Sequence, residues 1–338
     1  MLEPHQLPYV LAGMILMTLQ PLLTTLSQNQ DGKLDYNPVV ATLSSEILKI
    51  IISSVFLIQS GEARKQQLEI GELSRYAVPA VIYFVNNNLV FFILMHVNTT
   101  TFQILSQLKT VFTGLLFRVF LGRKLNKWQY LAIWQLTCGT ATSQIKLNAS
   151  ESSSSFSSLG YIISVVSCFL SACGGIYSEK LLKDNPNQSS IHWQNVQLYG
   201  WGVLFNATGA VFWDTDALTA ATPFKGFNFW AFLVVINNSL NGLAISAILK
   251  YADNIARVYA HAMAMILTMV LSVWFFGQST TPQLLIAIAM VGASAVQYNL
   301  KEDTPAQQAE NLVARSSNDS KPPGAAAAQL GKVEPVTE

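Results

Sequence analysis

The stretch 99–117, with the sequence TTTFQILSQLKTVFTGLLF, decides how this chain is interpreted, because it is apolar and carries Lys109 near its middle. Its length is close to the roughly 20 mostly apolar residues that a membrane-spanning helix needs. A lysine at the centre of such a helix costs roughly 2.5–3.5 kcal/mol on insertion scales, so it usually faces a water-filled cavity or a charged ligand. The stretch therefore predicts a membrane helix and favours a carrier for an anionic molecule.

The composition of the whole chain also indicates a membrane protein. Of its 338 residues, 51% are hydrophobic and only 12% are charged, whereas a soluble domain usually carries about 25% charged residues. The net charge of +1 says little about partners, but the absence of a basic run with interleaved aromatic residues argues against a nucleic-acid partner. Cys138, Cys168 and Cys173 lie in apolar segments without zinc-type spacing, so neither a metal nor a cofactor is expected.

Ten segments are apolar enough to span a bilayer, which predicts an all-α integral membrane protein. They cover residues 8–26, 38–58, 77–96, 98–121, 128–145, 159–182, 191–213, 227–250, 254–277 and 280–299. Lysine and arginine accumulate in cytoplasmic loops. With a cytosolic N-terminus, the even-numbered loops carry nine basic residues and the odd-numbered loops carry three. Both termini are therefore expected in the cytosol.

The domain organisation is expected to be one transmembrane domain, residues 1–300, followed by a disordered cytosolic tail, residues 301–338. The tail is rich in Ala, Pro, Ser, Asn and Gln, and such a composition buries too little apolar surface to fold. Within the domain, aligning spans four and five with spans nine and ten superposes similar residues. Two halves of five spans have opposite orientations in the membrane, so this faint repeat predicts a 5+5 inverted topology with a central binding site.

Further polar residues within the spans are candidates for the binding site. In span four a polar stripe at helical spacing either packs against other helices or, as its lysine favours, lines a cavity; it consists of Gln103, Ser106, Lys109, Thr110 and Thr113. Arg257 lies about one turn into span nine, where it either anchors the helix at the interface or binds phosphate through its planar fork of donors. Glu46 and Lys49 share a face of span two, where they either neutralise each other or line a cavity.

Two pairs combine an aromatic ring with an amide at i,i+4 spacing, which places both members on one helix face. Tyr83 and Asn87 form the first pair, and Asn195 and Tyr199 form the second. A nucleobase can stack on the ring while its edge hydrogen-bonds the amide. The alternative is that these residues serve only contacts between helices.

Several other polar positions receive structural or alternative interpretations. Asp253 precedes span nine and is expected to cap it. His261 is isolated among apolar residues and is expected to be packed and hydrogen-bonded. Asp214 and Asp216 form a D-x-D spacing in a predicted luminal loop, which is the feature that would favour a membrane enzyme of sugar transfer. No other acids lie nearby, so a carrier remains the favoured interpretation, and no enzymatic activity is expected. Asn148-Ala149-Ser150 is a candidate glycosylation motif.

Four segments resemble the nucleotide-sugar transporter family, and in particular its CMP-sialic acid transporter branch with the plant members. They are residues 78–88 (VPAVIYFVNNN), 102–109 (FQILSQLK), 194–199 (QNVQLY) and 250–255 (KYADNI). The resemblance extends over residues 8–299. It implies a ten-helix fold of the drug/metabolite transporter type in the Golgi membrane. It also implies exchange of a cytosolic nucleotide sugar for a luminal nucleoside monophosphate.

The resemblance assigns roles to individual residues. Lys109 resembles the family's phosphate-binding lysine, and Arg257 stands where many members have a second lysine. The residues that resemble positions around the nucleotide or near the ligand are Tyr83, Asn87, Asn195, Tyr199 and Ser246.

The identity of the sugar stays open, because the chain departs from the sialic acid branch at a few positions. Phe102 replaces a tyrosine common there, and Val258-Tyr259 stands where animal members have Gly-Phe. Tyr199 favours the CMP-type branch, since the UDP-galactose branch tends to have glycine. The expected function is exchange of CMP-sialic acid, or another CMP-linked sugar, for CMP. UDP-sugar/UMP exchange is the alternative, and a membrane enzyme is the less favoured one. The sequence does not indicate an oligomeric state.

Overall fold

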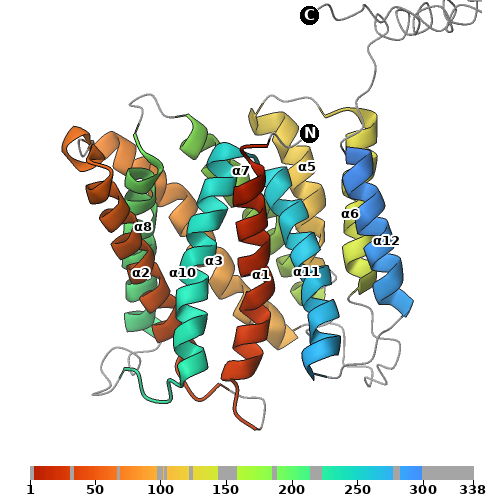
Figure 1. The fold of residues 1–338 in the computed structure, drawn as a ribbon, viewed down its shortest axis with the longest axis horizontal. Coiled ribbons are helices and arrows are strands. Elements are labelled where there is room, and N and C mark those ends of the chain that lie inside the picture. The colour runs from red at the N-terminus through yellow and green to blue at the C-terminus, as the bar shows by residue number, and fades with distance from the viewer. Residues whose placement is uncertain are drawn as a thin grey trace, which may run out of the picture. The chain divides into compact units, whose positions relative to one another are not determined.

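A computed structural model describes residues 4–30, 34–66, 69–96, 102, 105–121, 125–143, 158–184, 189–213, 223–276 and 282–298. Within these ranges the chain forms α-helices and one short 3-10 helix, without a strand (Figure 1). The elements are α1 (Leu7–Ser27), α2 (Pro38–Gln59), η1 (Glu62–Lys65), α3 (Ile70–His96), α5 (Leu108–Leu121), α6 (Lys127–Ser143), α7 (Ser158–Lys183), α8 (Ile191–Trp213), α10 (Phe229–Tyr251), α11 (Asn254–Phe276) and α12 (Pro282–Tyr298).

Four of these helices are long and apolar enough to cross a membrane by length and composition. They are α1, α2, the segment Leu159–Lys183 of α7, and α10. Large apolar side chains on their outer faces stay uncovered: Ile58, Ile162 and Phe229 are 69%, 61% and 69% exposed. Such surfaces are unfavourable in water and suit a lipid environment. The prediction of an all-α, multi-pass membrane protein is confirmed at this level.

One predicted boundary and the continuity of one predicted span are wrong. The third helix begins at Ile70 and not at residue 77, because its first two turns contain Glu72 and Arg75, which a search for apolar segments leaves out. The fourth predicted span, residues 98–121, is not one continuous helix. A turn at Gln107 interrupts it, and α5 begins only at Leu108. Apolar composition predicts membrane segments but does not report where the backbone hydrogen bonding is interrupted.

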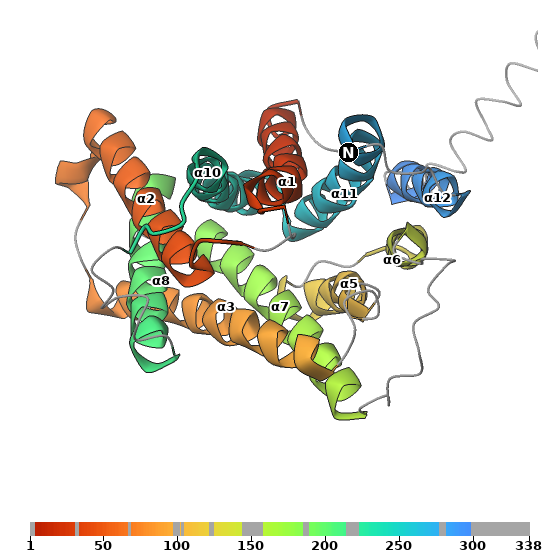
Figure 2. The same cartoon turned by 90° about the horizontal axis from the view of Figure 1, so that it is seen from below.

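The helices pack in an order that differs from their order in the chain. The first helix, α1, packs between α10 and α11, and α3 packs against α7 and α8 (Figure 2). Helix α2 packs against α8 and α10, while α12 packs mainly against α6 at one edge of the bundle. This arrangement encloses two cavities inside the bundle. Every described α-helix except α12 contributes residues to at least one of them.

Candidate functional site

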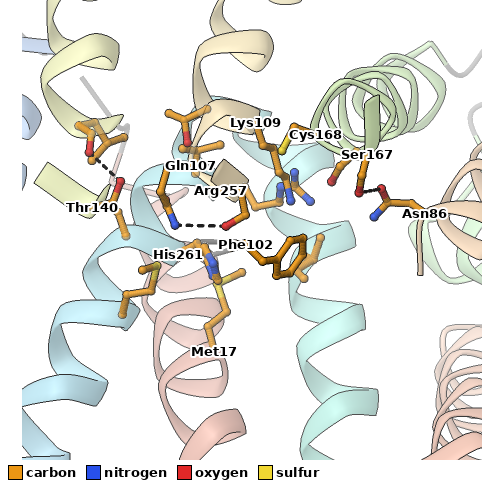
Figure 3. A pocket seen from close by; sticks show the side chains of 18 residues that line it. Met17, Asn86, Phe102, Gln107, Lys109, Thr140, Ser167, Cys168, Arg257 and His261 are labelled. Atoms are coloured by element: carbon orange, nitrogen blue, oxygen red, sulfur yellow. Dashed lines mark hydrogen bonds between the residues drawn. The ribbon is translucent and has the colours of Figure 1, made fainter. Parts of the chain in front are cut away.

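Two cavities adjoin inside the bundle, and Lys109, Ile245 and Arg257 line both. The larger chamber has a volume of about 540 Å³ and is lined mainly by α2, α3, α8 and α10. The smaller chamber has a volume of about 270 Å³ and is lined mainly by α5, α6, α7 and α11. Because they share these residues, the chambers form one polar compartment with two basic side chains where they meet (Figure 3).

The two basic side chains at this junction lack a carboxylate partner within the described residues. Arg257 is 9% exposed, and its Nη2 atom has no hydrogen-bond partner among these residues. Glu46 is the one carboxylate that lines either chamber in the described part of the chain, and it pairs with Lys49. The junction therefore carries two uncompensated positive charges. An unpaired buried charge is strongly unfavourable, so this arrangement is suited to an anionic ligand.

Both basic residues lie in the first turn of a helix. Lys109 is the second residue of α5, where the helix dipole and the N–H groups of the first turn add to its positive charge. Arg257 lies in the first turn of α11, and two acids accept hydrogen bonds from backbone N–H groups of that turn. Asp253 accepts a hydrogen bond from the Ala256 N–H at 2.7 Å, as a cap does. The buried carboxylate of Glu179 accepts one from the Asn254 N–H at 2.9 Å. Arg257 is thus held inside the bundle and is not an interfacial anchor.

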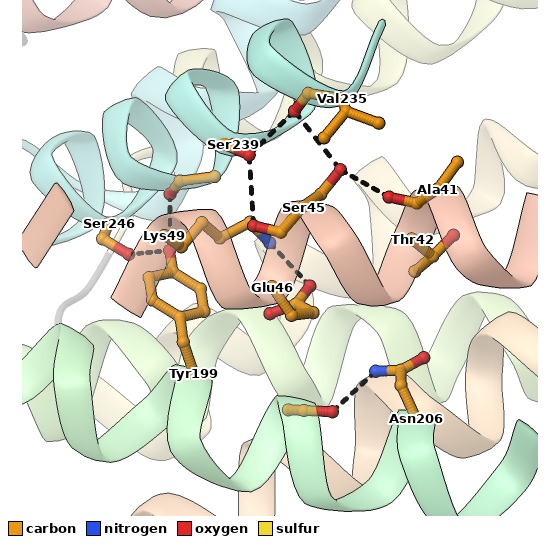
Figure 4. A network of polar contacts seen from close by, with 12 residues as sticks. Ala41, Thr42, Ser45, Glu46, Lys49, Tyr199, Asn206, Val235, Ser239 and Ser246 are labelled. Atoms are coloured by element: carbon orange, nitrogen blue, oxygen red, sulfur yellow. Dashed lines mark hydrogen bonds and ion pairs between the residues drawn. The ribbon is translucent and has the colours of Figure 1, made fainter. Parts of the chain in front are cut away.

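The larger chamber contains a network around Lys49 and Tyr199 (Figure 4). Lys49 Nζ lies 2.6 Å from Glu46 Oε1 and 4.7 Å from the centre of the Tyr199 ring. The Tyr199 hydroxyl donates to the Gly242 carbonyl at 2.8 Å and lies 2.8 Å from Ser246 Oγ. Both interpretations of Glu46 and Lys49 therefore hold, since they pair with each other and also line the cavity.

Glycines on the facing helices allow this pair to lie against the chamber wall. A Cβ atom added at Gly202 of α8 would lie 2.9 Å from Glu46 Oε2, and one added at Gly242 of α10 would lie 2.7 Å from Lys49 Cε. These separations are shorter than real Cβ contacts. The positions of both charged side chains therefore depend on the absence of a side chain opposite them.

Other residues of the larger chamber include one predicted tyrosine and several unpredicted amides. Tyr83 lines it, with its hydroxyl 3.2 Å from Ser178 Oγ. Asn206, Asn238 and Asn241 also line it but were not identified from the sequence. Asn238 and Asn241 lie three residues apart in an apolar helix, and that spacing was the available signal.

The smaller chamber presents hydroxyl and amide groups and one imidazole. His261 lines it and is exposed (Figure 3), so the expectation that this histidine is packed among apolar residues is wrong. Its neighbours Val258 and Ala262 line the same chamber, which explains the error, because apolar neighbours also occur on a cavity wall. The remaining polar groups are those of Asn86, Ser106, Gln107, Thr110, Thr140, Ser167, Cys168 and Ser171.

Some predicted site residues are not brought to the compartment or cannot be placed. Asn195 is 2% exposed and does not line either chamber. The side chain of Asn87 and all of Gln103 lie outside the described residues. The same holds for Asn148, Asp214, Asp216 and the tail 301–338. Among the described residues no group of three or more His, Cys, Asp or Glu side chains could hold a metal ion.

Comparison with known proteins gives a consistent result. Residues 6–299 match the model of the family described as nucleotide-sugar transporter. The chain is 39% identical to CMP-sialic acid transporter 1 of Oryza sativa subsp. japonica, covering 86% of this chain and 93% of that protein. It is also 39% identical to CMP-sialic acid transporter 1 of Arabidopsis thaliana, covering 84% and 86%.

More distant relatives are also found. The chain is 32% identical to the UDP-N-acetylglucosamine transporter of Rattus norvegicus, covering 62% of this chain and 65% of that one. A solved crystal structure superposes with a TM-score of 0.65 at 14% identity, covering 88% of this chain and 97% of the other. At that identity the likeness concerns the fold alone.

Proposed function

This chain belongs to the nucleotide-sugar transporter family, and from that premise we propose that it exchanges CMP-sialic acid, or another CMP-linked sugar, for CMP. The family is one of transporters, which agrees with the expectation of a carrier and not of an enzyme. The observation that carries the proposal is the pair of uncompensated positive charges, Lys109 and Arg257, at the junction of two polar chambers.

In this proposal the phosphate lies at the junction. Lys109 supplies a compact ammonium, and Arg257 supplies a planar fork of donors that matches phosphate oxygens. The nucleoside occupies the larger chamber, where Tyr83 and Tyr199 offer aromatic faces and Ser246 offers a hydroxyl. The sugar occupies the smaller chamber, whose hydroxyl and amide groups can hydrogen-bond sugar hydroxyls.

The remaining predicted residues are assigned as follows. Glu46 and Lys49 form the polar end of the nucleoside chamber and shape it through their pairing. Asn87 and Gln103 are retained as ligand contacts on the basis of the family resemblance. Asn195 is not assigned a ligand contact, since it is buried away from both chambers.

The two charges also explain why exchange should be favoured over one-way transport. Closing the compartment without a ligand would bury Lys109 and Arg257 unpaired, which is strongly unfavourable. A bound phosphate compensates both charges, so the loaded carrier should change conformation faster than the empty one. Either CMP or its sugar conjugate can supply the phosphate. Coupled exchange therefore needs no separate energy source.

The membrane arrangement belongs to the same proposal. We propose ten spans in a 5+5 inverted repeat, with both termini in the cytosol and residence in the Golgi membrane. The excess of basic residues in the even-numbered loops supports this orientation. Residues 1–300 would form the transport domain, and residues 301–338 a cytosolic tail.

Proteoliposomes loaded with labelled CMP test this function. External CMP or CMP-sialic acid should accelerate efflux strongly, while external AMP should not. Efflux that is equally fast without any external nucleotide would refute coupled exchange. Faster exchange with UMP and UDP-sugars than with CMP would favour the UDP-sugar alternative. Hydrolysis or transfer of the sugar, in place of movement of the intact ligand, would indicate an enzyme.

A further inference from the structure

Two adjacent glycines, Gly174 and Gly175, lie in the interior of α7. Glycine in a helix interior costs about 1 kcal/mol relative to alanine, so consecutive glycines call for a packing reason. A Cβ atom at Gly174 would lie 3.0 Å from Ile82 Cγ2, on α3. A Cβ atom at Gly175 would lie 2.9 Å from Arg257 Nη2, on α11. The two glycines therefore allow two different helices to approach α7 closely.

The contact at Gly175 involves polar atoms without hydrogen-bond partners among the described residues. The hypothetical Cβ would also lie 2.9 Å from Asn254 Nδ2 and 3.0 Å from Asn254 Oδ1. Asn254 is completely buried. Neither of its side-chain polar atoms, nor Arg257 Nη2, has a partner among the described residues. The Arg257 guanidinium therefore lies against the α7 backbone at Gly175, with the Asn254 amide beside it. The Arg257 side chain also lines both chambers.

The helices have little freedom to separate at this point. Glu179 lies one turn after Gly175 on α7, and its carboxylate accepts a hydrogen bond from the Asn254 N–H at 2.9 Å. The same carboxylate pairs with Lys183 at 2.7 Å. Lys183 in turn donates to the Ala252 carbonyl. A side chain at position 175 would therefore displace the side chains of Arg257 and Asn254, since the backbone of the α10–α11 turn is tied to α7.

We infer that Gly175 is a positioning residue that sets where the Arg257 guanidinium lies in the compartment. Because Gly175 has no side chain, Arg257 Nη2 can occupy the space beside α7. The second basic residue at the junction can therefore be an arginine. The consequence for ligand binding rests on the proposed function, since it takes Arg257 to be a phosphate ligand. The steric consequence does not depend on any ligand.

The test is a cycle of Gly175→Ala, Arg257→Lys and the double variant in the full-length protein. Lysine has no Nη2 atom, so it should relieve the part of the conflict that involves position 257, while the contact of the added methyl group with Asn254 remains in both backgrounds. Gly175→Ala should weaken CMP binding about tenfold or more, as expected when a charge-assisted hydrogen bond is misplaced. The double variant should bind CMP no more weakly than Arg257→Lys alone. Gly200→Ala is the matched control, because a Cβ at that helical glycine meets nothing within 4 Å.

Thermal unfolding of the ligand-free variants gives a second readout. Gly175→Ala should lower the midpoint of unfolding, and adding Arg257→Lys should restore the part of the loss that arises at position 257. The inference is overturned if Gly175→Ala behaves like Gly200→Ala, or if the losses of the two single variants simply add. A Gly175→Ala protein that fails to fold, with no rescue by Arg257→Lys, also overturns it. If the wild-type protein binds neither CMP nor UMP, the proposed function fails, while the unfolding cycle still decides the role of Gly175.

Discussion

Lys49 and Lys109 are both lysines of apolar helices, and both line the larger chamber, but their surroundings differ. Lys49 has Glu46 at 2.6 Å and the ring of Tyr199 at 4.7 Å. Lys109 shares its part of the compartment with a second cation, Arg257, and no carboxylate of the described residues pairs with it. A charge inside a membrane helix therefore does not by itself identify a ligand-binding group. In the proposed function, the lysine without a carboxylate partner is the one that binds the phosphate.

The strongest test of this comparison removes the unpaired lysine. Lys109→Met should abolish exchange, with a fall of at least about 100-fold in rate, because hydrogen bonds to charged groups contribute about 1.5–3 kcal/mol and the charge itself is also lost. The measurement is CMP exchange in proteoliposomes. Lys180→Met is the matched control, since Lys180 is an exposed residue of α7, and it should exchange at the wild-type rate. Exchange by Lys109→Met at half the wild-type rate or more would remove Lys109 from the site.

The second test makes Lys49 resemble Lys109. Glu46→Gln removes the partner of Lys49 and leaves a third uncompensated cation in the compartment. At an effective dielectric constant of about 20, a unit charge within about 10 Å of an anion contributes on the order of 1–2 kcal/mol. CMP should therefore bind about five- to thirtyfold more tightly, and exchange should become slower because release is slower. Calorimetric titration with CMP measures the affinity, and an unchanged or weaker affinity would contradict the prediction.

A smaller effect is expected at the aromatic ring beside Lys49. Tyr199→Phe keeps the ring but removes the hydroxyl that bonds the Gly242 carbonyl and Ser246. Both hydrogen bonds lie within the protein, and a neutral one contributes about 1 kcal/mol, so their loss should appear mainly as a lower midpoint of thermal unfolding. CMP binding should weaken by no more than about fivefold, through a less well held ring, with exchange retained. Tyr199→Leu should lose more, and equal losses in the two variants would show that the ring itself contributes nothing.

The smallest effect is expected at Asn195, which lies one turn from Tyr199 but lines neither chamber. Asn195→Ala should leave CMP affinity within about twofold of wild type, that is, about 0.4 kcal/mol. Its effect should appear in thermal unfolding, since the residue is buried. A tenfold loss of affinity at unchanged stability would restore Asn195 as a ligand contact.

The sequence was most informative where a residue is costly in its surroundings. Lys109, Arg257 and the Glu46–Lys49 pair were found because charges are rare in apolar helices. Amides were harder to interpret, because the same residue type serves two purposes on one helix. Asn237 donates to the Leu16 carbonyl and Asn241 donates to Gln20 Oε1, so both join α10 to α1. Of the two, Asn241 also lines the larger chamber. Only the packing of the neighbouring helices separates these cases.

The interruption at Gln107 could not be predicted for a related reason. Residues 98–121 have the composition of a single span, and composition does not report backbone hydrogen bonding. The interruption moves Lys109 from the middle of a helix to its first turn. The cost of a central charge was therefore the right signal for the site but gave the wrong local geometry.

The glycines opposite the charged side chains have a practical consequence for protein engineering. Glu46 lies against Gly202, Lys49 lies against Gly242, and both glycines belong to helices other than α2. If α2 of this chain is transferred alone into a relative that has side chains at these two positions, Glu46 and Lys49 would collide with them. Transfer of α2 together with α8 and α10 avoids this conflict.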